Sequence, residues 1–422
     1  MTTLTDPQKA SFKPSMLIYD TRYRSMTIQI FVLIAFIIFV FWLIDNTITN
    51  LVDLGKPVEF RFLSEAASYD INQRLIDYNS RDSHLRASFV GLLNTLVVAV
   101  LGCITATFLG VLIGVGRLSK NWLIAKIMTL YVETFRNVPV LLWILLAMAI
   151  MIESLPAPKA FRGENATATM YVSDSMAFTN RGVYVPEPLF SNPIGDVSLF
   201  GASSFRFDVS LDLIAILIVF FAGIYISGRI KRQADHIQND TGKRPTTWYL
   251  RIAVIVVPTA VLLWVLGFYM GYAELKGFNF KGGTHLRNSL IALWLALSLY
   301  TAAFIAEIVR AGIMAVSSGQ SEAAASLGLR PRRIMSLVIL PQALRVIVPP
   351  LISNYLNLTK NSSLAIAVGY MDITGTLGGI TLNQTGRELE CILMLMLVYL
   401  VISLSISAVM NWYNNSVKLV ER

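Results

Sequence analysis

The sequence predicts an all-α polytopic membrane protein with about eight transmembrane helices. Of its 422 residues, 55% are hydrophobic and only 14% are charged, and the apolar residues come in long uncharged runs. Soluble chains have roughly 45–50% apolar and about 25% charged residues. The mean hydropathy of +0.60 agrees with a membrane protein. The net charge of +9 is scattered between the apolar runs and forms no single basic stripe, which excludes a nucleic-acid-binding protein.

The uncharged runs predict where the chain crosses the membrane. The hydrocarbon core of a bilayer is roughly 30 Å thick and takes roughly 20 apolar residues in helical conformation. Eight segments without charged side chains approach or exceed that length, and the seventh is interrupted by one lysine: Ser25–Ile44, Ala87–Gly116, Asn137–Ile152, Leu213–Gly228, Ile252–Ala273, Asn288–Ala306, Val346–Thr359 with Asn361–Met371, and Cys391–Val417.

The distribution of Lys and Arg predicts the orientation. Eight crossings place both termini on one side, together with the loops 117–126, 229–251 and 310–345. These segments carry more Lys and Arg than the segments on the opposite side, although the opposite segments are longer in total. Because positive residues accumulate on the cytoplasmic side, both termini are expected in the cytoplasm. No small-residue cleavage site follows the first apolar run, so a retained first helix is favoured over a cleaved signal peptide.

Two crossings are irregular in sequence. Glu133 and Arg136 interrupt the third apolar pattern and Pro139 follows at once, so a bent or broken helix is expected between residues 122 and 152. In the seventh crossing, Pro349 and Pro350 are expected to mark the entrance, and a lysine lies near the middle. A proline in the fifth crossing, at position 258, predicts a kink there.

The segment from 317 to 341 predicts a helix, a tight turn and a second helix on the cytoplasmic face. Ser321 is expected to cap the first helix, with Glu322 in its first turn and three alanines extending it. Gly328 is expected to end it in the left-handed conformation. Pro331 suits the first turn of a second helix, expected to run from about Arg332 to Leu340.

The spacing in this loop resembles a known motif. Glu322, Ala323, Ala324, Gly328 and Pro341 are spaced as in the EAA loop of permease subunits of ATP-binding-cassette importers, with valine at 338 where isoleucine is usual. The stretches YVETFRNVPV (131–140), YTAAFIAEIVRAGI (300–313) and KNSSL (360–364) are similar to the polar amino acid branch of these permeases. Together they resemble most closely the permeases of general L-amino acid transport systems.

The resemblance implies an ABC importer type I permease core with a cytoplasmic EAA coupling helix. Residues 86–153 and 287–422 would form the two parts of this core, with the EAA loop at 317–341. Residues 1–85 would add a cytoplasmic N-terminus, an extra first span and a periplasmic loop. Residues 154–286 would insert a periplasmic loop, helix-poor from Leu155 to Phe207, and two further spans.

The function implied is that of a membrane-spanning permease subunit of an ATP-driven amino acid importer in the bacterial inner membrane. L-amino acids would arrive from a periplasmic binding protein. A second, related permease and two ATPase subunits would complete the transporter. The residues implied in coupling to the ATPase are Glu322, Ala323, Ala324, Gly328, Arg330 and Pro341. No G-x-x-x-x-G-K-[ST] motif occurs in the chain, so no cofactor is expected here, and ATP and Mg would be bound by the ATPase.

Polar residues at membrane depth are candidates for the substrate pathway, because an intramembrane charge costs roughly 2.5–3.5 kcal/mol on insertion scales. Glu133 with Arg136, and Glu307 with Arg310, have i, i+3 spacing, so local pairing is the favoured interpretation and substrate contact the alternative. Lys360 has no such neighbour. The predicted pathway residues, able to bind the carboxylate or complete hydrogen bonds, are Arg136, Asn137, Lys360, Asn361, Ser362 and Ser363.

The sequence argues against catalysis and metal binding. The only histidines, His84, His236 and His285, lie in different loops without ligand spacing, and no serine, histidine and carboxylate set can be assembled. The alternative to an ATP-driven importer is an ion-coupled secondary transporter. That class would need unpaired intramembrane acids and repeated halves, and no convincing repeat is present.

Overall fold

The computed structural model describes residues 16–19, 21–162, 166–201 and 203–417. The chain ends predicted to be cytoplasmic, 1–15 and 418–422, lie outside this part. By its internal contacts the chain divides into Met1–Arg61 and Phe62–Arg422. The first unit holds α1 (Met16–Tyr19) and α2 (Thr21–Asp53). The apolar side chains of α2 are exposed on all sides, as a helix surrounded by lipid requires.

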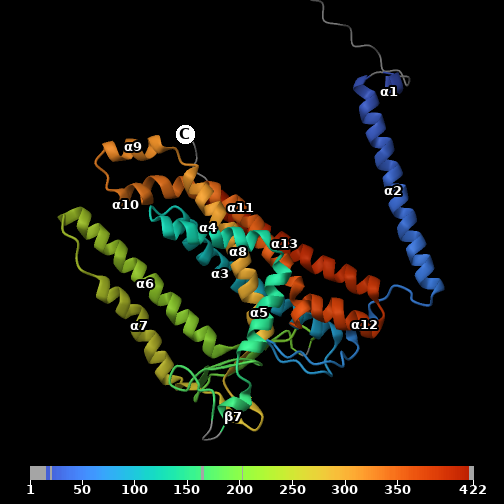
Figure 1. Cartoon of the computed structure of the whole chain (residues 1–422), viewed down its shortest axis with the longest axis horizontal. Coiled ribbons are helices and arrows are strands. Elements are labelled where there is room, and N and C mark those ends of the chain that lie inside the picture. The colour runs from blue at the N-terminus through green and yellow to red at the C-terminus, as the bar shows by residue number, and fades with distance from the viewer. Residues whose placement is uncertain (1–15, 20, 163–165, 202, 418–422) are drawn as a thin grey trace, which may run out of the picture. The chain divides into compact units, whose positions relative to one another are not determined.

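The second unit is mainly helical (Figure 1). Its α-helices are α3 (His84–Arg117), α4 (Trp122–Asn137), α5 (Val140–Ser154), α6 (Leu211–Thr241), α7 (Trp248–Val265), α8 (Asn288–Met314), α9 (Ser318–Ser326), α10 (Pro331–Ile334), α11 (Leu340–Asn361), α12 (Leu382–Thr385) and α13 (Glu388–Val417). Its 3₁₀ turns are η1 (Arg61–Ser64, which begins at the boundary), η2 (Pro158–Phe161) and η4 (Ser362–Val368), and its π-helical segments are η3 (Met335–Ile339) and η5 (Thr374–Thr381).

Short antiparallel strands gather at one end of the second unit, here called the strand side (Figure 1). They are β1 (Ala177–Thr179), β2 (Gly182–Val185), β3 (Glu187–Phe190), β4 (Asp196–Leu199), β5 (Phe207–Ser210), β6 (Phe268–Gly271), β7 (Glu274–Lys276), β8 (Asn279–Lys281) and β9 (Thr284–Arg287). The order β1-β2-β9 forms one sheet, and β3-β6, β4-β5 and β7-β8 form pairs. Strand β9 leads directly into α8, which ties the largest sheet to the membrane core.

The described residues contain eight helices long and apolar enough to cross a membrane, which confirms the predicted number. The break in the third crossing is also confirmed, because α4 ends at Asn137, Pro139 follows, and α5 begins at Val140. The stretch 155–207 contains little helix, as predicted, but its strands were not predicted. They are too short for alternation to be read from sequence, and β2 and β3 are held by pairing with the distant strands β9 and β6.

Two predicted crossings need correction. The fifth was expected to end at Ala273, but α7 ends at Val265 and β6 follows, pairing with β3. In the seventh, Pro349 and Pro350 do not mark the entrance but lie inside α11. Prolines are tolerated in membrane helices when neighbouring groups satisfy the freed carbonyls.

Helix α8 forms the centre of the membrane core and is buried along most of its length. It packs against α3, α4, α5 and α11, and the largest cluster of buried apolar residues surrounds it. Two hydrogen bonds join it to its neighbours. The indole of Trp294 donates to Thr105 at 3.1 Å, and the hydroxyl of Tyr131 donates to the carbonyl of Leu299 at 2.6 Å.

Glycines set the close approach of α3 to α8. A Cβ added at Gly114 would lie 2.7 Å from the carbonyl oxygen of Ala306 and 2.9 Å from the Cβ of Val309. Contacts this short with a backbone atom cannot be relieved by a side-chain rotation. Small residues at such positions allow membrane helices to pack through their backbones.

We therefore expect Gly114→Val to separate α3 from α8 and to cost roughly 1–3 kcal/mol of stability. The thermal unfolding midpoint of the purified protein and its elution in gel filtration measure this effect. Gly228→Val in α6 is the matched control, because no atom lies within 4 Å of the Cβ that would be added there. Equal midpoints for the two variants would contradict the packing argument.

Helices α6 and α7, in the inserted region, form a hairpin. They pack on each other, and their other contacts are mainly with strands β4, β5 and β6 (Figure 1). A Cβ at Gly223 of α6 would lie 2.9 Å from the carbonyl oxygen of Val254 in α7, so a small residue is needed there. Pro258 lies inside α7, and the predicted kink at this residue stays a prediction.

Candidate functional site: the exposed helix α9 and the polar residues of the membrane core

Helix α9 lies at the end of the core opposite the strands (Figure 1). It follows α8 after only three residues, and Ser317 is at its N-cap position. The expected cap, Ser321, is instead within the helix, and Glu322 is beyond the first turn. The helix begins four residues earlier than predicted, because the segment Ser318–Ser321 continues the helical backbone despite its low propensity.

The turn after α9 has the predicted geometry. Gly328 has φ +75° and its N–H donates to the carbonyl of Ala325 at 2.9 Å. Arg330 is the N-cap residue of α10, and Pro331 occupies the first turn. The second helix was expected to stop near Leu340. Instead α10 passes through the π-helical segment η3 into α11, so the turn is joined to the seventh crossing by continuous helical backbone. Pro341 follows η3 inside this continuous helical backbone, so its missing N–H removes one intrahelical donor at the π-helical segment.

The C-terminal half of α9 and its C-cap carry exposed apolar residues, whereas Ser318, Gln320 and Ser326 are exposed polar residues of the same helix. Ala323, Ala325 and Leu327 are exposed, and Leu327 has 80% of its surface accessible. Ala324 alone in this helix is buried, where α9 packs against α10 and η3. Glu322 is exposed beside the apolar residues. A single apolar residue on a surface is ordinary, but an exposed alanine and leucine face with one carboxylate suits contact with another protein.

Three charged residues form a cluster of ion pairs near the end of α8 that leads to α9. The carboxylate of Glu307 accepts from Arg310 on the same helix, with Nη2 to Oε1 at 2.6 Å, as the spacing predicted. It also accepts from Arg117 at the end of α3, which was not predicted. The side chain of Arg117 is only 10% exposed. The cluster therefore links α8 to α3 at Glu307, eleven residues before α9 begins at Ser318.

Arg136 and Asn137 lie at the end of α4. The guanidinium carbon of Arg136 is 5.4 Å from the ring centroid of Phe304 in α8, a cation–π geometry. Among the described ion pairs Arg136 has none with Glu133, so the favoured local pairing is wrong in this structure. The side chain of Asn137 donates to the carbonyl of Glu133 at 2.8 Å.

Lys360 and Ser363 line a cavity of about 860 Å³. Thr374, Tyr399 and Ser403 supply further polar groups, and leucines of α13 supply the apolar wall. Ser362 is buried and donates to the carbonyl of Thr359 at 2.7 Å. Asn361 ends α11 beside them.

The predicted pathway residues thus fall into two groups. Residues 360–363 lie together near α13, whereas Arg136 and Asn137 lie on α4 against α8. No described hydrogen bond, ion pair or cavity joins the two groups.

Asp372 was missed by the sequence reasoning. It lies between η4 and η5 and is fully buried. Its carboxylate accepts from the N–H of Gly375 at 2.8 Å and from the hydroxyl of Tyr399 at 3.3 Å. Burial raises the pKa of Asp372 to about 6, although these hydrogen bonds act in the opposite direction. The signal available in sequence was one carboxylate among the uncharged residues between Lys360 and Arg387.

This pKa predicts a pH effect on stability. The folded state holds the Asp372 proton up to about pH 6, whereas the unfolded chain releases it near the model-peptide value of 3.8. The folded state is therefore stabilised as the pH falls from above 6 towards 4. We expect Asp372→Asn to remove this part of the pH dependence, measured as the unfolding midpoint of both proteins from pH 7.5 to 4.5. Identical pH profiles would contradict the assignment.

Eight helices able to cross a membrane, with a short exposed helix between two core helices, define the class of polytopic membrane proteins, and this arrangement suits a transport permease. Comparisons with known proteins agree. Residues 240–419 match the profile of the family "Binding-protein-dependent transport system inner membrane component". The chain belongs to this family, among the permeases of amino-acid ABC transporters.

The relatives match along the whole chain. The glutamate/glutamine/aspartate/asparagine transport system permease protein BztB of Rhodobacter capsulatus is 57% identical over 100% of both chains. The general L-amino acid transport system permease protein AapQ of Rhizobium johnstonii is 43% identical over 98% of this chain and 96% of that protein. These matches confirm the predicted family and do not support the ion-coupled alternative.

Among solved structures, the chain is similar to one described as an amino acid ABC transporter with histidines. The TM-score is 0.43 and the sequence identity is 18%. The similarity covers 79% of this chain and 95% of the other.

Proposed function

We propose that this chain is the permease subunit that carries L-amino acids across the bacterial inner membrane in an importer driven by a separate ATPase. The observation that supports this most is the placement of α9. It is exposed, it follows the central helix α8 closely, and helical backbone joins its turn to α11. Movement of α9 by a partner would therefore act directly on two helices of the membrane core.

The proposed ATPase contact is the surface formed by Glu322, Ala323 and the following residues of α9. The turn at Gly328 is proposed to direct this surface away from the membrane core. Arg330 lies at the start of the next helix. ATP and Mg are proposed to bind the ATPase, because this sequence has no phosphate-binding loop motif. Two such ATPase subunits are proposed per transporter.

The proposed orientation places α9 and both termini in the cytoplasm and the strand side in the periplasm. Its support is the excess of Lys and Arg in the segments on the α9 side. A periplasmic binding protein would then deliver amino acids at the strand side. The described permease core between the two sides would carry them inward.

A second, related permease is proposed to cover the exposed charges of the core. Glu133, Arg136 and Lys360 are exposed on the isolated chain at membrane depth. Charged side chains there are favourable only when they face protein or a water-filled cavity. A pathway between two permeases supplies such a cavity.

The substrates proposed are polar L-amino acids, with glutamate, glutamine, aspartate and asparagine first among them. The relative from Rhodobacter capsulatus, which matches over the whole length, is named for these four. Lys360 and Arg136 are proposed to attract substrate carboxylates, with Asn137, Asn361, Ser362 and Ser363 completing hydrogen bonds.

We expect Lys360→Met to lower amino acid uptake roughly tenfold, the effect of losing one charged hydrogen bond, while the complex still assembles. Lys360→Arg, which keeps the charge, is the control and should retain most of the uptake. Normal transport by the methionine variant would remove Lys360 from the pathway.

The function itself is tested in proteoliposomes that contain this chain, its proposed permease and ATPase partners and a binding protein. Uptake of labelled glutamate and glutamine should require ATP on the side of the membrane where α9 lies. Uptake that follows an ion gradient without ATP would overturn the proposal.

A further inference from the structure

The cavity near α13 that contains Lys360 also holds a pair of hydroxyl groups. Tyr399 of α13 and Thr374 of η5 both line this cavity, and their hydroxyl oxygens lie 3.1 Å apart. The volume of about 860 Å³ is within the roughly 300–1,000 Å³ of small-molecule sites. Leucine and methionine side chains form most of the remaining lining, and its other polar residues are Lys360, Ser363 and Ser403.

A carboxylate lies directly behind the hydroxyl pair. Asp372 is fully buried, and its Oδ2 accepts from the hydroxyl of Tyr399 at 3.3 Å. Its Oδ1 accepts from the N–H of Gly375 at 2.8 Å. None of the described ion pairs includes Asp372. Its two hydrogen-bond donors are therefore neutral, and no cation of the described chain balances its charge.

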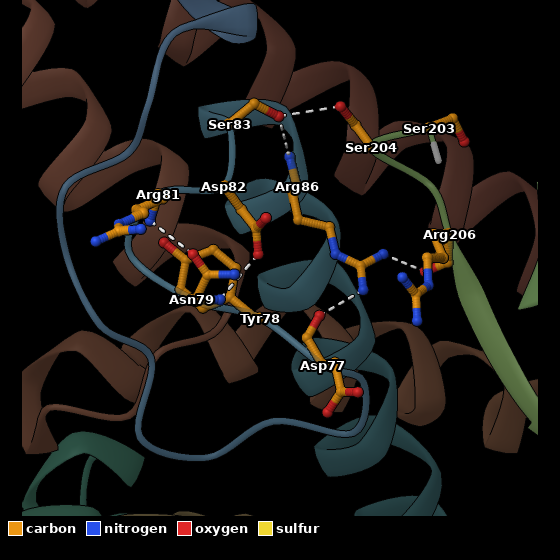
Figure 2. A pocket seen from close by; sticks show the side chains of 10 residues that line it. All are labelled: Asp77, Tyr78, Asn79, Arg81, Asp82, Ser83, Arg86, Ser203, Ser204 and Arg206. Atoms are coloured by element: carbon orange, nitrogen blue, oxygen red, sulfur yellow. Dashed lines mark hydrogen bonds between the residues drawn. The ribbon is translucent and has the colours of Figure 1, made fainter. Parts of the chain in front are cut away.

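A buried charge without an ion pair need not indicate a ligand. Arg86 shows this at the N-terminus of α3, where its terminal nitrogens donate to the main-chain carbonyls of Asp77 and Arg206 (Figure 2). These carbonyls belong to the protein itself, so the guanidinium is satisfied without a ligand. Asp372 differs, because one of its donors is a hydroxyl group that lines a cavity. Its charge therefore acts on a group that a ligand would contact.

Helix α3 holds the turn that carries Asp372. The side chain of Asn94 donates to the carbonyl of Met371 at 2.8 Å. The N–H of Ile373 donates to the hydroxyl of Thr95 at 3.1 Å. Both neighbours of the aspartate in the chain are thus bonded to a core helix. A binding group supported by such contacts keeps a fixed position, as recognition of a small ligand requires.

The carboxylate determines the direction of the hydrogen bonds in this cluster. An ionised carboxylate can only accept, so the hydroxyl hydrogen of Tyr399 points to Asp372. The oxygen of Tyr399 can then only accept, and the hydroxyl of Thr374 donates to it. The remaining lone pairs of the two oxygens can accept from a molecule in the cavity. A ligand at this pair must therefore donate hydrogen bonds.

The described part of the chain provides no cation for these oxygens. Lys360 lines the same cavity, but it is exposed and has no described hydrogen bond to Tyr399 or Thr374. The hydroxyl of Ser362 also lies beside Tyr399, but it donates its hydrogen to the carbonyl of Thr359 at 2.7 Å. The donor that matches the pair must come from outside the chain.

We propose that the hydroxyl pair of Tyr399 and Thr374 binds the ammonium group of the transported amino acid, and that Asp372 is the residue that positions this pair. An ammonium group is a cation with three donors, so it matches oxygens that can only accept and it balances the buried charge. Every amino acid carries this group, whatever its side chain. The inference rests on the proposed function, because it names the group of the substrate that this cavity recognises.

The test measures binding to the purified complex of this chain with its partner subunits, in nanodiscs at pH 7.5 and without binding protein. Labelled L-glutamine is the first probe. Unlabelled glutaramate, which has the same carboxylate and amide but no ammonium group, is the competitor. The unmodified complex should bind L-glutamine about tenfold more tightly than glutaramate. Tyr399→Phe should weaken L-glutamine binding about tenfold and leave glutaramate binding unchanged, so the preference disappears.

Asp372→Asn tests the positioning role. Asparagine keeps an oxygen for the N–H of Gly375, but it no longer holds the tyrosine hydroxyl as an acceptor. The preference for L-glutamine should fall about tenfold, whereas a merely structural role would weaken both ligands equally. Asp212→Asn is the matched control, because this buried carboxylate also accepts from a main-chain N–H but lies outside the cavity. Tyr249→Phe, at an exposed position of α7, is the control for Tyr399→Phe. Both controls should keep the preference of the unmodified complex.

Three results would overturn the proposal. The first is an unmodified complex that binds glutaramate as tightly as L-glutamine, or that binds neither. The second is an unchanged preference in Tyr399→Phe. The third is equal weakening of both ligands in Asp372→Asn. If the preferences change as expected but uptake by the complete transporter does not depend on ATP, the proposed function alone is wrong.

Discussion

Gly328→Pro is expected to abolish ATP-driven amino acid uptake and to prevent co-purification of the ATPase. Proline fixes φ near −65°, whereas Gly328 has φ +75°. Proline would also remove the N–H that donates to Ala325. The turn must therefore rearrange, at a cost of roughly 3 kcal/mol or more, and α9 can no longer keep its direction. The measurements are uptake into proteoliposomes and recovery of the ATPase with the tagged permease.

The membrane core should survive this substitution. No atom lies within 4 Å of a Cβ added at Gly328, so the change meets no packed neighbour. Gly319→Ala, in the same loop and also with open space around its Cβ, is the control and should transport normally. If Gly328→Pro transports at the wild-type rate after losing the ATPase, α9 does not couple the two proteins.

Glu307→Gln is expected to destabilise the core by roughly 3 kcal/mol. The change leaves Arg117 and Arg310 close together without their carboxylate, and Arg117 is too buried for water to compensate. Because the cluster joins α3 to α8 just before α9, the ATP hydrolysed per amino acid imported should also increase. The thermal midpoint and this ratio are measured on the same nanodisc preparation.

Two further variants test whether the unpaired arginines cause the loss of stability in Glu307→Gln. Adding Arg117→Met to Glu307→Gln removes one of the unpaired cations, so part of the lost stability should return. Glu274→Gln makes the same chemical change at an ion pair on β7 whose side chains are 68% and 62% exposed. Exposed pairs contribute roughly 0–1 kcal/mol, so this control should be nearly neutral. A loss as large as that of Glu307→Gln would show that the cluster has no special role.

The substitution tests separate packing from coupling. Gly114→Val acts on the contact of α3 with α8 and should affect stability first, whereas Gly328→Pro acts outside the core and should affect transport first. Substitution of Glu307 should affect both stability and transport, because its two arginine partners lie on α3 and α8, and α8 leads to α9.

Sequence reasoning found the membrane crossings because their signal is local. A helix in lipid must satisfy its backbone hydrogen bonds internally and needs about 20 apolar residues in a row. Each crossing can therefore be predicted without knowing its neighbours. The break at Pro139 and the left-handed Gly328 are equally local, since a ring or a missing Cβ sets φ at that residue. The structure agrees with both.

Features made by distant segments could not be found in this way. Strands β2 and β3 pair with β9 and β6 across long stretches of chain, and β6 replaces the expected end of the fifth crossing for that reason. The extension of α10 through η3 into α11 depends on how α9 packs against them. The candidate pathway residues were predicted as one set, but the structure places them in two groups.

By itself the sequence determined the class of the protein, its eight crossings and the position of the exposed loop. Lipid requires each crossing helix to be apolar, and this composition can be recognised without knowing the tertiary structure. Only the tertiary structure decided which charges meet. Glu307 with Arg117, Asp372 with Tyr399, and Arg86 with the carbonyl of Arg206 each join residues of different structural elements. Electrostatic interactions act over a few ångströms in space, and sequence spacing reports that distance only within one helix.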